Sequence, residues 1–73
     1  MDARSLRYFS MVAQEGSFSR AADRLHVAQP ALSQQIKKLE ADLGTQLLRR
    51  TGRGAVPTDA GLKLLAHALE ILQ

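Results

Sequence analysis

Apolar residues recur at helical spacing through the first part of the chain, and residues that end or begin helices interrupt the pattern. The first stripe consists of Leu6, Phe9 and either Val12 or Ala13. Gly16 suits the end of this helix, because glycine tolerates the left-handed conformation found there. Ser17 can then cap a second helix through its hydroxyl oxygen. The pattern therefore predicts helices over residues 3–15 and 18–25.

A third helix, predicted over residues 29–43, has one apolar and one polar face. Its apolar positions are Leu32, Ile36, Leu39 and Leu43. Pro30 suits the first turn, because its missing N–H has no helical partner there, and Gly44 ends the helix. A short break separates this helix from the second one, which predicts a helix-turn-helix over residues 18–43. Many such units have glycine in the break, but this chain has His26.

The second part of the chain predicts a hairpin followed by another helix. The sequence TGRG, in which Arg53 lies between two glycines, separates two strand-like segments, 46–50 and 54–57. Pro57 limits the second strand to the edge of a sheet. Thr58 supplies a capping hydroxyl, and an acid favoured by the helix dipole follows it. The expected fold class is mainly α: a winged helix-turn-helix with a three-helix core, a short β-hairpin wing and a long C-terminal linker helix.

The last helix carries more apolar surface than one small domain needs. One stripe consists of Leu62, Leu65, Leu69 and Leu72. We therefore expect these leucines to form a homodimer interface, although they could be ordinary core. No helix-ending residue precedes Gln73. The expected division is a winged helix-turn-helix domain over 1–58 and the start of a longer linker or dimerisation helix over 59–73.

The charge distribution indicates a polyanionic partner. The net charge is only +3, but no acid lies between residues 24 and 39 or between 43 and 58. These two windows hold Arg24, Lys37, Lys38, Arg49, Arg50 and Arg53. They coincide with the third helix and the hairpin, so DNA is the simplest explanation, while a solvated basic surface is the alternative.

Other classes of protein find little support in the sequence. The chain has no cysteine and only two histidines, far apart, so we expect no metal and no cofactor. No nucleophile–base pair, carboxylate pair or phosphate-binding glycine loop can be assembled, so we expect no enzyme. No signal peptide or apolar run of membrane-spanning length is apparent, so we expect no membrane partner and a cytoplasmic location.

The polar face of the third helix suits recognition of base edges in a DNA major groove. The expected base contacts are Gln29, Pro30, Ser33 and Gln34, with Arg53 at the hairpin tip entering an A·T-rich minor groove. The expected phosphate contacts are Ser17, Ser19, Lys37 and Arg50. Arg49 and Arg50 alternate along a strand, so only one should face the DNA. Ordinary solvated polarity is the alternative for each residue, and helix capping is the alternative for Ser17.

The segments LRYFSMVAQEGSFSRAADRLHVAQPALSQQIKKLEADLGTQLLRR and PTDAG closely resemble the N-terminal DNA-binding domain of LysR-type transcriptional regulators. The resemblance runs from Leu6 to the end of the chain. It implies a recognition helix over residues 29–43, a hairpin-tip arginine at Arg53, and dimers or tetramers on interrupted palindromes. It also implies a small-molecule effector domain, which would follow and is absent from these residues. Position 34 is often arginine in this family, so Gln34 implies a different base preference.

A winged-helix protein-interaction module is the competing hypothesis. In that case the last helix and the hairpin would dock a protein partner. The chain would then bind DNA negligibly, and Arg53→Ala would leave partner binding intact.

Overall fold

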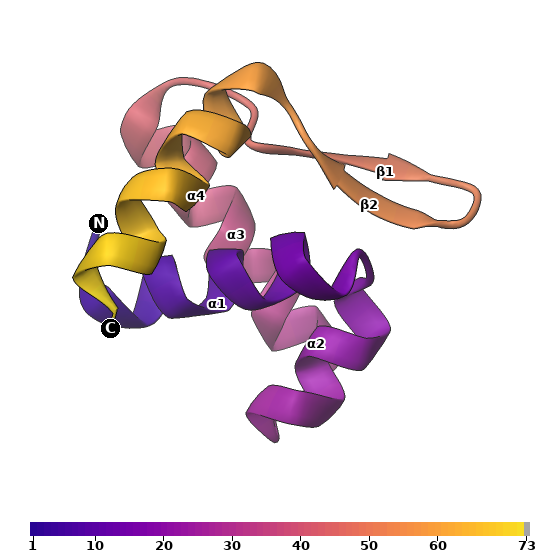
Figure 1. The fold of residues 1–73 in the computed structure, drawn as a ribbon. Helices are drawn as coiled ribbons and strands as arrows, with labels where there is room; N and C mark the ends of the chain where they lie inside the picture. The colour runs from indigo at the N-terminus through magenta and orange to yellow at the C-terminus, as the bar shows by residue number, and fades with distance from the viewer. Residues whose placement is uncertain (73) are drawn as a thin grey trace.

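The computed structural model describes residues 1–72 as four helices and one antiparallel hairpin (Figure 1). The elements are, in chain order, α1 (Ala3–Glu15), α2 (Phe18–Leu25), α3 (Gln29–Leu43), β1 (Leu48–Thr51), β2 (Gly54–Pro57) and α4 (Asp59–Ile71). The predicted helices and hairpin are confirmed, with β1 beginning two residues later than expected. The hairpin projects from the helices as a wing, and both ends of the chain lie on the opposite side (Figure 1).

Local hydrogen bonds fix the helix ends. The Asp2 carboxylate accepts a hydrogen bond of 2.8 Å from the Ser5 backbone N–H, and this bond holds the pKa of Asp2 below its usual value. The Ser17 hydroxyl accepts from the Arg20 N–H at 3.1 Å, as predicted. His26 occupies the turn between α2 and α3, where many such units have glycine, and it adopts the left-handed conformation with φ of 58°.

The hydrophobic core lies where α1 meets the other three helices. Its largest fully buried side chains are Phe9, Val12, Leu32, Leu39 and Leu47. Leu32, Ile36 and Leu39 of α3 are buried as predicted, but the fourth member of that stripe is not. Leu43 is 40% exposed, because it is the last residue of α3 and extends past the body of the domain.

The wing is bound to the helical body by backbone hydrogen bonds. The Ala55 N–H donates to the Gly16 carbonyl oxygen at 2.9 Å, so β2 lies against the α1–α2 turn. A Cβ at Gly54 would overlap that same oxygen. At the start of β1, the Glu40 carboxylate accepts from the N–H groups of Leu47 and Leu48, at 2.7 and 3.2 Å. These bonds fix the wing relative to α3.

Candidate nucleic-acid interface

Helix α3 presents a polar recognition face to solvent. We define the recognition face as Gln29, Pro30, Ser33, Gln34 and Lys37. All are exposed except Ser33, which is half-buried. The Ala28 side chain provides no cap for the first N–H groups of α3. The opposite face of the helix is held in the core, so the recognition face is rigidly supported.

Arg50 is exposed, and its side chain lies beside the recognition face. Its Nη2 donates a 2.8 Å hydrogen bond to the Ser33 Oγ, and its guanidinium lies 3.9 Å from the centroid of the Phe18 ring. Arg49, the preceding residue, lines a separate hollow with Thr58 and Asp59. The predicted alternation along β1 is therefore confirmed, with Arg50 on the side of the recognition face.

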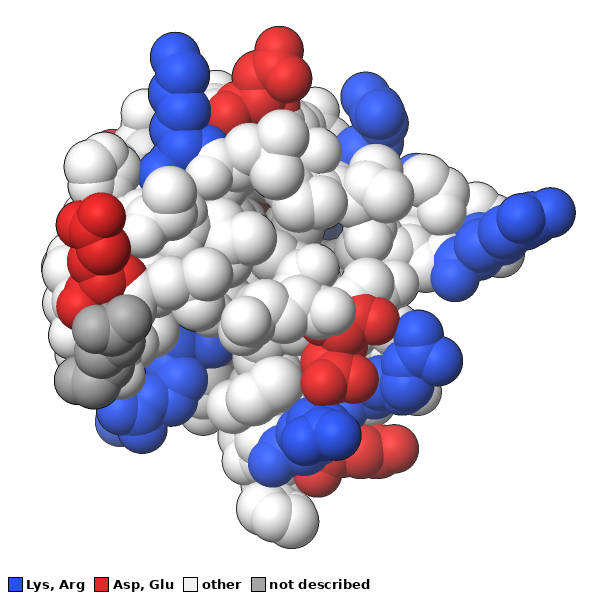
Figure 2. Space-filling view, in the orientation of Figure 1, with Lys and Arg blue, Asp and Glu red and all other residues white. Residues whose placement is uncertain are grey.

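The tip of the wing carries Arg53. Its backbone N–H donates to the Thr51 Oγ1 at 3.2 Å, which helps to order the tight turn, and its side chain is exposed. Figure 2 shows a basic side chain at the projecting end of the wing, with no acidic side chain beside it in this view. A cation on such a thin projection is well placed to enter a groove.

Two hollows connect the helices with the wing. One, of about 200 Å³, is lined by Ser17, Ser19, Gln29, Arg50 and Thr51 among others. It brings the two predicted phosphate-binding serines at the start of α2 together with the start of α3. The other, of about 300 Å³, lies between α3 and β1 and includes Ser33, Lys37 and Arg50 in its lining. Ser17 serves as a helix cap and lines the first hollow, so both of its predicted roles are compatible with the geometry.

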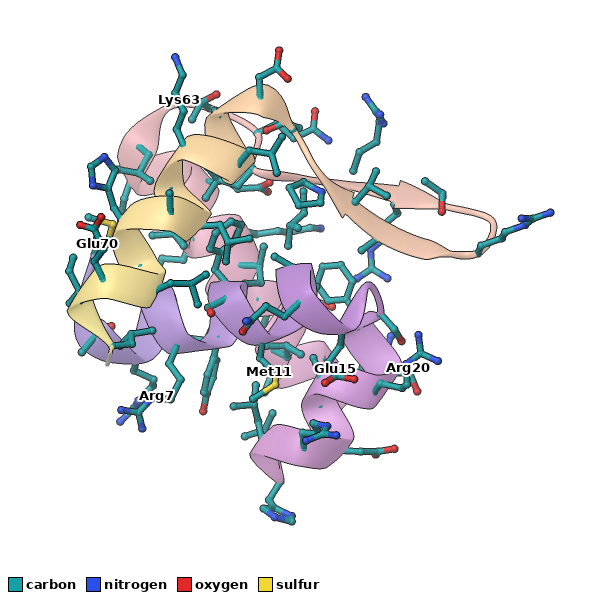
Figure 3. The ribbon with its side chains drawn as sticks, in the orientation of Figure 1. Arg7, Met11, Glu15, Arg20, Lys63 and Glu70 are labelled. Atoms are coloured by element: carbon teal, nitrogen blue, oxygen red, sulfur yellow. The ribbon has the colours of Figure 1, made fainter. Side chains whose placement is uncertain are left out.

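One arginine of the basic windows is engaged in an ion pair away from the recognition face. The Arg24 Nε lies 3.0 Å from the Glu15 carboxylate, and the Arg20 Nε lies 4.0 Å from it. Arg20 also donates to the Glu15 backbone oxygen at 3.1 Å. Figure 3 shows Glu15 and Arg20 close together beside the α1–α2 turn. The pairing could not be seen from the sequence windows, because Glu15 belongs to the preceding helix.

The apolar stripe of α4 is divided between the core and the surface. Leu65 packs against the core cluster, and Leu72 is half-buried. Leu62 and Leu69 are 54% and 39% exposed, and Ile71 is 65% exposed. The free part of the predicted interface therefore consists mainly of Leu62 and Leu69. Within residues 1–72, no helix is long and apolar enough to cross a membrane.

The fold and this interface define a winged helix-turn-helix domain, with a supported recognition helix beside a basic wing. The family model "Bacterial regulatory helix-turn-helix protein, lysR family" matches residues 3–62. The chain belongs to this family, which confirms the resemblance given by the sequence.

Similar proteins and solved structures agree with this assignment. The nitrogen assimilation regulatory protein nac of Escherichia coli K12 is 53% identical over all 73 residues, which cover 24% of that protein. YnfL of the same organism, an uncharacterised HTH-type transcriptional regulator, is 50% identical over 72 residues, which are 99% of this chain and 24% of YnfL. The chain thus spans about a quarter of the length of these relatives.

Two solved structures with this fold are complexes with DNA. The CbnR DNA-binding domain in complex with DNA matches with a TM-score of 0.94 and 49% identity, covering 99% of this chain and 83% of that one. The BenM DNA-binding domain on catB site 1 DNA matches with a TM-score of 0.95 and 47% identity, covering 99% and 80%. The predicted fold class is confirmed.

Proposed function

We propose that this chain is a sequence-specific DNA-binding domain of a bacterial LysR-type transcriptional regulator. The observation that carries the proposal is the recognition face, which stands free of acids and lies beside a wing with a basic tip. Helix α3 would lie in the major groove with Gln29, Pro30, Ser33 and Gln34 against base edges. Arg53 would enter the adjacent minor groove.

Phosphate contacts would hold the domain in register on the duplex. Lys37 is exposed at the edge of the recognition face, and Ser17 and Ser19 line the hollow at the start of α2, where backbone N–H groups favour an anion. Arg50, expected from the sequence as a further phosphate contact, is already hydrogen-bonded within the chain. We therefore assign the register-setting role mainly to the other three residues.

We also propose that two copies bind an interrupted palindrome through pairing of their α4 helices. The exposed Leu62 and Leu69 support this arrangement, because a paired surface would remove them from water. In the full-length protein, a following effector domain would receive the small molecule and permit tetramers, as the fourfold greater length of the relatives suggests. The protein would then act in the bacterial cytoplasm as a regulator and not as an enzyme.

A pair of substitutions on α3 tests the recognition face. Gln34→Ala should lower affinity for the preferred duplex about tenfold and change affinity for random DNA little, because it removes a base contact. Lys37→Ala should weaken binding to both duplexes similarly and reduce the slope of log affinity against log salt by about 1, because it removes a phosphate contact. Fluorescence anisotropy over a salt series measures both effects.

The comparison of these two variants is its own control. Both residues are exposed on the same helix, so a general effect on folding would change both in the same way. Identical effects of the two substitutions on preferred and random DNA would show that the recognition face is wrong. Absence of DNA binding by the unmodified chain, even at low salt, would instead favour the protein-interaction module.

A further inference from the structure

We propose that Arg50 is a positioning residue that fixes Ser33 as a hydrogen-bond donor toward DNA and thereby makes one base position reject cytosine. This inference rests on the proposed function, since it requires α3 to face the bases. It assigns to Arg50 a part in sequence preference, which a phosphate contact would not have.

Arg50 joins three elements at one point. It belongs to β1, its guanidinium lies over the ring of Phe18 of α2, and it donates to the hydroxyl of Ser33 of α3. Phe18 is only 7% exposed, so the ring is a fixed platform. A planar guanidinium stacked on a fixed ring has few alternative positions, which restricts the hydrogen bond to Ser33.

The chemistry of the two groups sets the direction of this bond. A guanidinium has donors and no acceptor, so the Ser33 oxygen must accept, which leaves its O–H free to donate. Within residues 1–72, the hydroxyl proton of Ser33 has no hydrogen-bond acceptor in the protein. Serine on a helix face would otherwise use its hydroxyl equally in either sense, so Arg50 biases this hydroxyl toward donation by occupying one of its two lone pairs.

The consequence for recognition follows from the major-groove edges. Purine N7, guanine O6 and thymine O4 are acceptors and can take the Ser33 proton. The cytosine amino group is a donor, so it would have to share the Ser33 oxygen with the donating guanidinium beside it. The Ser33 proton would then have no acceptor on that base, which disfavours cytosine. The base contacted by Ser33 should therefore be any base except cytosine.

Selection of bound duplexes from a random DNA library, followed by sequencing, tests this assignment. The 73-residue chain is compared with Arg50→Met, Ser33→Ala and the double variant. Methionine keeps a long side chain over Phe18 but donates no hydrogen bond. The matched control is Arg49→Met, which removes the same charge from the neighbouring residue on the other side of the wing.

The unmodified chain and Arg49→Met should reject cytosine about tenfold at one base position, and Ser33→Ala should relax that same position. Arg50→Met should relax it to about twofold or less, and the double variant should relax it no further, because the two residues act through one contact. The overall loss of affinity from the removed charge should be similar in Arg50→Met and Arg49→Met.

Three results would overturn the inference. The first is that Arg50→Met keeps the base preferences of Arg49→Met and only binds every duplex more weakly. That behaviour would show Arg50 to be a phosphate contact. Should Arg50→Met not fold, Ser33→Ala carries the test. Ser33→Ala identifies the base position that Ser33 contacts. If the unmodified chain prefers cytosine at that position, Ser33 does not act as a donor there. A library with no enriched sequence for the unmodified chain would overturn the proposed function, and this inference with it.

Discussion

Gly61→Ala should destabilise the domain strongly, even though alanine is the better helix former. Alanine in a helix interior is favoured over glycine by about 1 kcal/mol. At this position, however, a Cβ would overlap the Leu47 main-chain oxygen and lie 3.3 Å from the Pro57 Cβ. The Leu47 oxygen cannot yield easily, because it accepts a 2.9 Å hydrogen bond from the Thr58 N–H. Overpacking of this kind costs about 1–3 kcal/mol or more, so the overlap should outweigh helix propensity.

We expect a net loss of about 2 kcal/mol, a large part of the few kcal/mol available to a domain of this size. The melting temperature should fall by roughly 10 °C, measured by circular dichroism at 222 nm. Gly52→Ala is the matched control: a Cβ there meets nothing within 4 Å, and the change should stay within about 0.5 kcal/mol. A Gly61→Ala domain as stable as the unmodified chain would show that α4 does not pack this closely on the Leu47 backbone.

Leu69→Glu should abolish cooperative binding to a two-site duplex while leaving single-site binding unchanged. Leu69 is 39% exposed, so a single domain tolerates glutamate there, whereas two glutamates in a paired α4 interface would be desolvated close together. Joining two half-site contacts in one dimer raises overall affinity by a factor of about 10² to 10⁴, and this factor would be lost.

This effect is measured by comparing the affinity for a palindromic duplex with the affinity for a duplex that carries a single half-site. Analytical ultracentrifugation gives the mass of the free chain. His67→Glu is the control, because His67 is exposed two positions earlier and therefore lies on the opposite side of α4. It should dimerise and bind as the unmodified chain does. An unchanged palindrome affinity in Leu69→Glu would place the dimer interface elsewhere.

The fold could be predicted from the sequence because its signals are local. Each of these signals acts within a few residues: the helical spacing of apolar residues, the caps at Ser17 and Thr58, and the two glycines around Arg53. They indicate the elements without any knowledge of the packing. Leu43 shows the limit of this approach, because periodicity gives the direction of a side chain but not where the neighbouring elements end.

The details of the interface depend on contacts between distant segments and could not be predicted. Arg50 and Ser33 are 17 positions apart, so nothing in the sequence joins them before the wing is placed. The same holds for Glu40, whose carboxylate accepts hydrogen bonds from the start of β1, although in the sequence it is simply the first acid after a basic window. The sequence likewise gives no sign that position 61 needs a glycine, because the oxygen that requires it belongs to Leu47, 14 positions earlier.

The most direct test of the central claim is a titration of the 73-residue chain against two labelled duplexes by fluorescence anisotropy at near-physiological salt. One duplex carries an A·T-rich interrupted palindrome, and the other has the same bases shuffled. We predict clearly tighter binding to the palindrome, by tenfold or more, and loss of most of this preference in Arg53→Ala, because the wing then no longer enters the narrow minor groove. Equal binding of the unmodified chain to both duplexes would contradict sequence-specific recognition by this domain.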